Sequence, residues 1–146
     1  MWGIYDYIDG RGRNDIAEWT RQLQKPERIK LRSKLDMLAI AGGDLPPDLL
    51  MKTEVPYIYK LKVQGNPKLR PMICRQHLKF AEKDLRFGNQ DSLVKIDEEV
   101  YVVLIGAKEI SWEYEPAGAD IDAGHRRIAV IANPQQRLCR HERIDR

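Results

Sequence analysis

The spacing of apolar residues near the start of the chain predicts a strand followed by a helix. Residues 2–8 are mostly aromatic or β-branched and Gly10 breaks the run, so we expect a short strand there. Asn14 is placed to cap a helix over residues 15–24. The apolar side chains of that helix recur on one face, at Ile16, Trp19 and Leu23. This face is therefore expected to pack against a core.

A second helix is predicted to follow after a short turn. Pro26 suits the first turn of a helix, and Gly42 with Gly43 favours an end there. Its buried stripe is expected to comprise Ile29, Leu31, Leu35, Leu38 and Ala39. Residues 44–56 contain three prolines and are interpreted as a loop.

Residues 57–75 predict a β-hairpin that carries cations on one face. Alternation along a strand over residues 57–63 puts its aromatic and aliphatic side chains on one face, and residues 64–67 have turn chemistry. The opposite face of this strand and of its return strand carries Lys60, Lys62 and Arg70. This face can be a phosphate-binding surface or an ordinary solvated face of a sheet.

The second half of the chain predicts a central strand and a final helix. Residues 75–97 have weak helical character to about Phe87, and we interpret them as an excursion between strands. Residues 100–105 are continuously apolar and suit a buried strand at the centre of the sheet. Residues 120–132 predict a helix. Because the order of elements contains no βαβ alternation, we expect an α+β fold with an antiparallel sheet.

Length and charge limit the class of protein. A chain of 146 residues fits a single domain over residues 1–146. The net charge is only +3, yet six arginines and two acidic residues follow His125, so a basic tail is expected from about residue 133. Such a cluster can contact a polyanion or an acidic partner, or it can be a soluble tail. No run approaches the roughly 20 apolar residues of a membrane span, so we expect a cytoplasmic protein without membrane contact.

Few residues carry a recognisable catalytic pattern. Cys74 with His77, and Cys139 with His141, are poorly spaced for zinc, and we expect neither a metal nor a cofactor. His125 precedes a basic pair on the final helix and is a candidate proton carrier. Trp112 and Tyr114 can stack on bases, although their alternation with glutamates favours an edge strand.

Several segments together resemble a known family. These are the region from Tyr5 to Gly43, IYKLKV, KLRPMIC, VYVVLIGAKE and the final helix. They are similar to the RelE/HigB superfamily of bacterial toxin-antitoxin systems, and most of all to its phage-derived HigB-like branch. The resemblance implies two N-terminal helices on a small antiparallel sheet with a C-terminal helix. It also implies an endoribonuclease toxin that cleaves mRNA on the ribosome and is held by a cognate antitoxin, expected to be a helix-turn-helix protein.

The resemblance assigns roles to individual residues. The catalytic cations would be Lys62, Arg70 and Lys108, which match basic positions of the family pattern, with His125 as a proton carrier. In this chemistry the 2′-hydroxyl of the RNA attacks the adjacent phosphate, and cations stabilise the charge that develops. Lys60 has no counterpart in the pattern. The candidate residues for binding RNA are Lys60, Arg126 and Arg127.

Three features depart from the family pattern. Pro71 removes a hydrogen-bond donor from the return strand, which predicts an edge or a bulge there. Glu109 stands where the family has a second cation, and the excursion over 75–97 is longer than the turn expected. The alternative is therefore a non-catalytic, phage-related binding protein on the same fold, either an inhibitor of a host enzyme or an inactive toxin relative.

Overall fold

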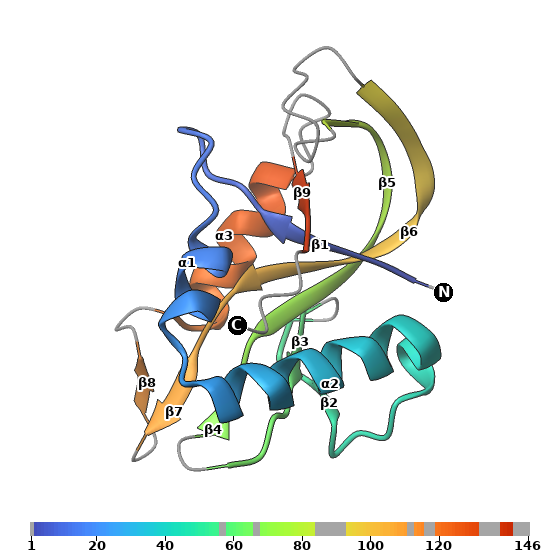
Figure 1. Cartoon of the computed structure of the whole chain (residues 1–146). Coiled ribbons are helices and arrows are strands. Elements are labelled where there is room, and N and C mark those ends of the chain that lie inside the picture. The colour runs from blue at the N-terminus through green and yellow to red at the C-terminus, as the bar shows by residue number, and fades with distance from the viewer. Residues whose placement is uncertain are drawn as a thin grey trace.

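The computed structural model describes residues 2–55, 58–65, 68–83, 93–110, 113–115, 119–131 and 138–141. These form an α+β fold in which three helices accompany a six-stranded mixed sheet and a three-stranded antiparallel sheet (Figure 1). Within the described residues, no helix combines the length and the apolar character that crossing a membrane requires.

The two N-terminal helices form where the apolar pattern predicts them. Helix α1 (Asp15–Gln22) begins at Asn14, whose side-chain oxygen accepts a hydrogen bond from Ala17 N at 2.9 Å. Helix α2 (Lys25–Ala41) has Pro26 in its first turn and is followed by the 3₁₀ helix η1 (Gly42–Asp44). One residue of the expected stripe is placed differently, because the side chain of Ile29 is 50% exposed.

The large sheet is mixed, which corrects the expectation of an antiparallel sheet. Its strand order is β2-β3-β5-β6-β1-β9, with β1 (Gly3–Tyr7) parallel to β6 (Leu93–Ile105). The absence of βαβ alternation did not exclude this pair, because its two strands are far apart in the sequence and are not joined by a single crossover helix. The central position predicted for 100–105 is confirmed, since this part of β6 is buried between β5 and β1.

Strands replace two segments for which the sequence predicted a loop or weak helix. Strand β2 (Leu50–Lys52) lies within the expected loop and pairs with β3 (Ile58–Leu61). Strand β5 (Met72–Lys83) runs far into the region of weak helical character and pairs with β6 along its length. Pairing with β6 satisfies the backbone of β5, and this tertiary contact overrides a weak local propensity. Residues 84–92 of the expected excursion lie outside the described residues.

Pro71 marks the point at which the chain passes from one sheet to the other. The small sheet has the order β4-β7-β8, formed by β4 (Lys68–Leu69), β7 (Lys108–Ile110) and β8 (Glu113–Glu115). Beyond Pro71 the chain enters β5, and the register with β6 shifts between Met72 and Ile73. The irregularity predicted from the proline is therefore confirmed.

The large sheet is covered by helices from both ends of the chain (Figure 1). Helix α3 (Ile121–Ile131), predicted over 120–132, packs closely on one face, where Gly124 approaches Ile58 and Leu104. The apolar face of α2 contributes its three buried leucines to the same core, namely Leu31, Leu35 and Leu38.

Part of the expected basic tail belongs to the sheet. Strand β9 (Leu138–Arg140) pairs antiparallel with the outer side of β1, so Arg140 is ordered by backbone hydrogen bonds. Residues 133–137 and 142–146 of the predicted tail lie outside the described residues.

Candidate functional site

Three of the cations predicted for the site share one face of the chain. The backbone N–H groups of Leu61 and Val63 donate toward Pro71 O and Leu69 O, whereas Lys62 N donates to Leu49 O on the opposite side. This alternation shows that the chain stays extended beyond β3, so Lys60 and Lys62 lie on the same face. The bridge between Val63 and Leu69 puts the next residue, Arg70, on that face as well. The two-residue period of the hairpin therefore placed Lys60, Lys62 and Arg70 together correctly.

Tyr114 joins this face from the small sheet. The Lys60 ammonium nitrogen is hydrogen-bonded to the Tyr114 hydroxyl and lies 4.8 Å from the centroid of its ring. Tyr114 belongs to β8, which confirms the edge strand expected there, and Trp112 lies outside the described residues. The sequence could not predict the contact between Lys60 and Tyr114. The alternation of Tyr114 with two glutamates indicates a strand, but it does not show which residue the tyrosine contacts. Lys60 and Tyr114 together form a part-buried site with an ammonium and a hydroxyl.

Arg70 lies on this face by its register, but its side chain is buried within the protein. Its relative exposure is 5%, and its guanidinium donates to Val63 O at 3.3 Å and to Leu69 O at 2.8 Å. Its Nε lies 3.4 Å from Oε2 of Glu109. Glu109, which stands where the family pattern has a second cation, therefore acts as the counter-ion of Arg70. In this arrangement Arg70 organises the junction of the two sheets.

Lys108 lies on the other side of the small sheet. Its register partner is Leu69, and its Nζ lies 3.5 Å from Oε2 of Glu27 in the first turn of α2. Lys108 also lines a cavity of about 290 Å³ together with Lys30 and Gln64. The structure thus separates Lys108 from Lys60 and Lys62, although the resemblance placed all of them in one site.

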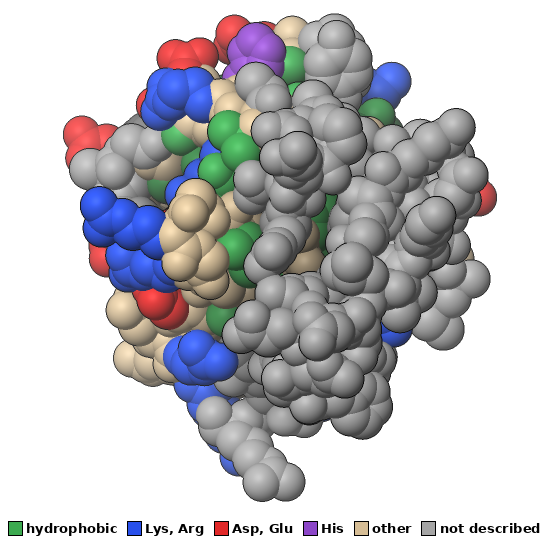
Figure 2. Space-filling model, turned by 90° about the horizontal axis from the view of Figure 1, so that it is seen from above, with side chains coloured by type: hydrophobic (Ala, Val, Ile, Leu, Met, Phe, Trp, Pro, Cys, Tyr) green, Lys and Arg blue, Asp and Glu red, His purple; other side chains and the backbone are tan. Residues whose placement is uncertain are grey.

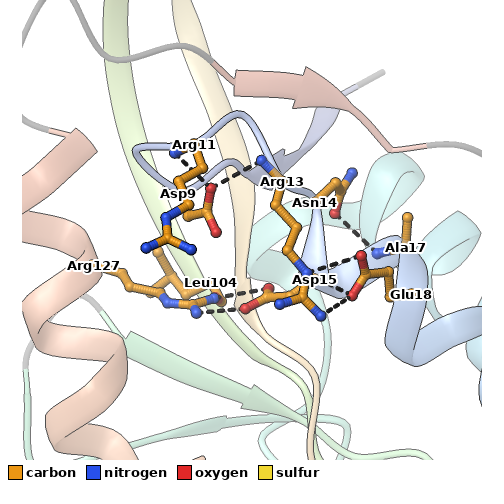
Figure 3. Close-up of polar contacts among 9 residues, drawn as sticks. All are labelled: Asp9, Arg11, Arg13, Asn14, Asp15, Ala17, Glu18, Leu104 and Arg127. Carbon is orange, nitrogen blue, oxygen red and sulfur yellow. Dashed lines mark hydrogen bonds and ion pairs between the residues drawn. The ribbon is translucent and has the colours of Figure 1, made fainter.

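The predicted residues of α3 divide between solvent and the protein interior. The side chains of His125 and Arg126 are exposed, whereas Arg127 reaches α1. Figure 3 shows the Arg127 guanidinium against Asp15, with Nη1–Oδ1 and Nη2–Oδ2 distances of 3.0 and 2.5 Å. Arg127 also donates to Leu104 O at 2.8 Å and stacks on Tyr7 at 4.4 Å. Arg127 therefore connects α3 to α1, and these contacts occupy most of the guanidinium group that RNA binding would need.

The loop before α1 is held by its own charged residues. Asp9 accepts hydrogen bonds from the backbone N–H groups of Arg13 and Arg11, and these lower the pKa of its carboxyl, the bond from Arg13 most. The Arg13 side chain pairs with Glu18 at 2.5 Å and lowers the pKa of that carboxyl in turn (Figure 3). Asp9 and Glu18 are partly exposed surface residues, so we interpret them as supports of the loop that leads into α1.

Acidic side chains lie beside basic ones on part of the described surface (Figure 2). Figure 2 shows Lys and Arg side chains next to Asp and Glu side chains on one side of the molecule. In the part of the chain that the structure describes, no group of three His, Cys, Asp or Glu residues could hold a metal ion. Comparison of the chain with protein-family models, curated proteins and solved structures gave no match.

The arrangement of Lys60, Lys62 and Tyr114 is suited to one kind of chemistry. The Tyr114 hydroxyl can donate a proton, and the Lys60 ammonium beside it would stabilise the phenolate that remains. Lys62 adds a second positive charge on the same face, which would attract a phosphate group. Among the described residues neither lysine forms an ion pair with a carboxylate, which distinguishes them from Arg70, Lys108 and Arg127.

Proposed function

We propose that this protein is an endoribonuclease that acts on mRNA at the ribosome, as the toxin of a type II toxin-antitoxin system. The observation that carries the proposal is the contact between Lys60 and Tyr114 on the face that also bears Lys62. The resemblance to the RelE/HigB superfamily supports it, and the α+β fold with two N-terminal helices is compatible with that resemblance. A cognate antitoxin, expected to be a helix-turn-helix protein, would be the physiological partner.

The proposed cleavage uses only groups of the RNA and of this face. The 2′-hydroxyl oxygen attacks the adjacent phosphorus and its proton passes to water, while the bond from phosphorus to the 5′-oxygen breaks. Tyr114 gives its proton to the leaving 5′-oxygen, and Lys60 stabilises the phenolate. Lys62 stabilises the phosphorane, and Arg70 acts as a positioning residue through β4. The products are a 2′,3′-cyclic phosphate and a 5′-hydroxyl.

The decisive experiment compares wild-type protein with Tyr114→Phe and Lys60→Met after induction in bacteria without antitoxin. Wild-type protein should arrest growth and leave mRNA fragments with 5′-hydroxyl ends. Tyr114→Phe keeps the ring and removes the proton, so cleavage should fall about 100-fold or more. Lys52→Ala is the matched control. Lys52 is an exposed lysine of β2 that pairs with Tyr59, so it lies on the opposite face of the sheet from Lys60.

Two results would contradict the proposal. One is unchanged growth with soluble wild-type protein present. The other is equal mRNA cleavage by wild type and Tyr114→Phe, with melting curves that show both proteins folded.

A second function, binding without cleavage, is favoured by a specific observation. Arg70 and Lys108 are paired with Glu109 and Glu27, so two of the expected catalytic cations are neutralised inside the protein. A phage-related inhibitor of a host enzyme on this fold would arrest growth without cutting mRNA. Mapping of mRNA ends after induction distinguishes the two functions, because only the nuclease creates new 5′-hydroxyl ends.

A further inference from the structure

Helix α2 exposes apolar side chains on the face that points away from the core. Among the described residues, five large apolar side chains are exposed, and three of them lie on α2. These are Ile29, Met37 and Ile40, which are 50%, 36% and 72% exposed. The same helix buries its three leucines in the core on its other side. Helix α2 is therefore apolar on two faces, and the fold covers only one of them.

The exposed apolar residues form one line along the helix. Ile29, Ser33, Met37 and Ile40 follow each other at intervals of four, four and three residues, so they share one face, which we call the outer stripe. The outer stripe extends over about 16 Å of the helix axis. Spacings of three and four residues are those by which one helix packs against another, and the small Ser33 leaves room for a large side chain of a partner. The geometry of the outer stripe therefore fits a second helix.

Lysines border the outer stripe. Lys25 lies four residues before Ile29, in line with it, whereas Lys30 and Lys34 lie one turn apart along one side of the stripe. Lys25 and Lys30 are exposed, and Lys34 Nζ lies 3.9 Å from the sulfur of Met37. A partner helix packed on the stripe would thus have three ammonium groups beside it.

The two acidic residues of α2 already have cationic partners within the protein. Glu27 Oε2 lies 3.5 Å from Lys108 Nζ, on the side of the helix that meets the small sheet. Asp36 forms an ion pair with Arg32 at 4.0 Å, so the formal charges of these two residues offset each other. The charge at the border of the outer stripe is therefore set by the three lysines, and a negatively charged partner is favoured.

We propose that the outer stripe docks an acidic amphipathic helix of a partner protein, whose apolar residues pack on the stripe and whose carboxylates meet the three lysines. Charged residues that flank an apolar seam determine which helix pairs with it. A second copy of this chain would bring the same lysines and no compensating excess of negative charge. A membrane surface fits less well, because helices that lie on bilayers use a wider apolar face, commonly with aromatic residues. The proposal does not depend on the proposed nuclease, since α2 carries none of the residues assigned to cleavage.

Fluorescence anisotropy of the full chain with a labelled synthetic peptide tests the outer stripe. The peptide is an amphipathic helix of about 20 residues, long enough to be partly helical alone, with a leucine stripe bordered on both sides by glutamates. In the comparison peptide lysines replace the glutamates. The glutamate peptide should bind at least about tenfold more tightly than the lysine peptide, and its affinity should fall as salt is raised.

Variants of the protein test the apolar and the charged part separately. Ile40→Ser should weaken binding of the glutamate peptide about tenfold, and it should remain folded because this side chain is mostly exposed. Val130→Ser, at an exposed apolar residue of α3, is its control. The double variant Lys30→Glu with Lys34→Glu should prefer the lysine peptide. Lys52→Glu, at an exposed lysine of β2, is the control for the change of charge and should bind like wild type.

Four results would overturn the proposal. The first is binding of the glutamate peptide weaker than about 1 mM. The second is an affinity that Ile40→Ser and the double charge variant both leave unchanged. A wild-type dimer that Ile40→Ser dissociates in sedimentation velocity would assign the outer stripe to a second copy of the chain. Binding to vesicles of phosphatidylcholine and phosphatidylserine that Ile40→Ser abolishes, without binding of the glutamate peptide, would assign it to a membrane.

Discussion

Arg70 and Glu109 form an ion pair at the junction of the two sheets. Their side chains are 6% and 25% exposed, and Nε lies 3.4 Å from Oε2. The backbone N–H of Arg70 donates to Ala107 O at 2.8 Å, so side chain and backbone both connect the end of β4 to β7 and the residue before it. Pro71 follows directly, so this ion pair stabilises the point at which the chain passes from β4 to β5.

Replacement of Glu109 by alanine should destabilise the protein by about 3 kcal/mol, because it leaves the Arg70 guanidinium buried without its counter-ion. Glu109→Gln keeps a hydrogen-bond acceptor and should lose only about 1 kcal/mol. Urea unfolding followed by circular dichroism measures both. Equal losses for the two variants would show that the charge of Glu109 contributes little. Glu115→Ala, at an exposed edge-strand glutamate, is the control and should change stability little.

The sequence predicted which cations share a face but not which of them are neutralised. Alternation along a strand is a local property, and it placed Lys60, Lys62 and Arg70 together. The pairing of Arg70 with Glu109 depends on the register of β4 with β7, in which Lys68 faces Glu109 and Leu69 faces Lys108. That register joins segments about 40 residues apart, and a shift of one residue would exchange Lys108 and Glu109 between the two faces.

The same distinction applies to the fold. The caps and apolar stripes of the helices are local in sequence, and the helix ends were close to the predicted ones. The parallel contact of β1 with β6 and the strand character of β5 beyond Arg75 arise from pairing between distant segments. Charged residues that alternate weakly along such a strand carry little local preference, so the partner strand decides.

The contact between Arg127 and Asp15 should stabilise the packing of α3 against α1. The two residues form a bidentate ion pair, and Arg127 also donates to Leu104 O (Figure 3). Asp15→Asn should lower the free energy of unfolding by about 1 kcal/mol. Arg127→Met should lower it further, because the bond to Leu104 O is lost too.

A double-mutant cycle separates the ion pair from these other contacts of Arg127. The coupling energy between Asp15→Asn and Arg127→Met should be about 1 kcal/mol and should shrink at high salt, since both side chains are partly exposed. Strict additivity of the two substitutions would mean that the pair contributes nothing to stability. Arg126→Met is the matched control on the neighbouring, exposed position of α3.

Cys74 should make stability fall at alkaline pH. Its thiol is buried on β5, and burial raises the pKa of this thiol from 9.0 to about 12. Above pH 9 the unfolded chain loses the thiol proton while the folded chain keeps it, so the unfolded state binds fewer protons and its formation becomes easier as pH rises. Below pH 9 both states hold the proton and the effect is absent.

The contribution of Cys74 can be isolated from that of other groups that titrate at alkaline pH. Between about pH 7.5 and pH 10, wild type should lose about 1 kcal/mol more stability than Cys74→Ala, measured by urea unfolding at each pH. Cys139→Ala should keep the wild-type slope, because Cys139 is only partly buried. At about pH 8 iodoacetamide should also modify Cys139 before Cys74, since the buried thiol stays protonated and shielded. Identical pH slopes for wild type and Cys74→Ala would contradict the raised pKa.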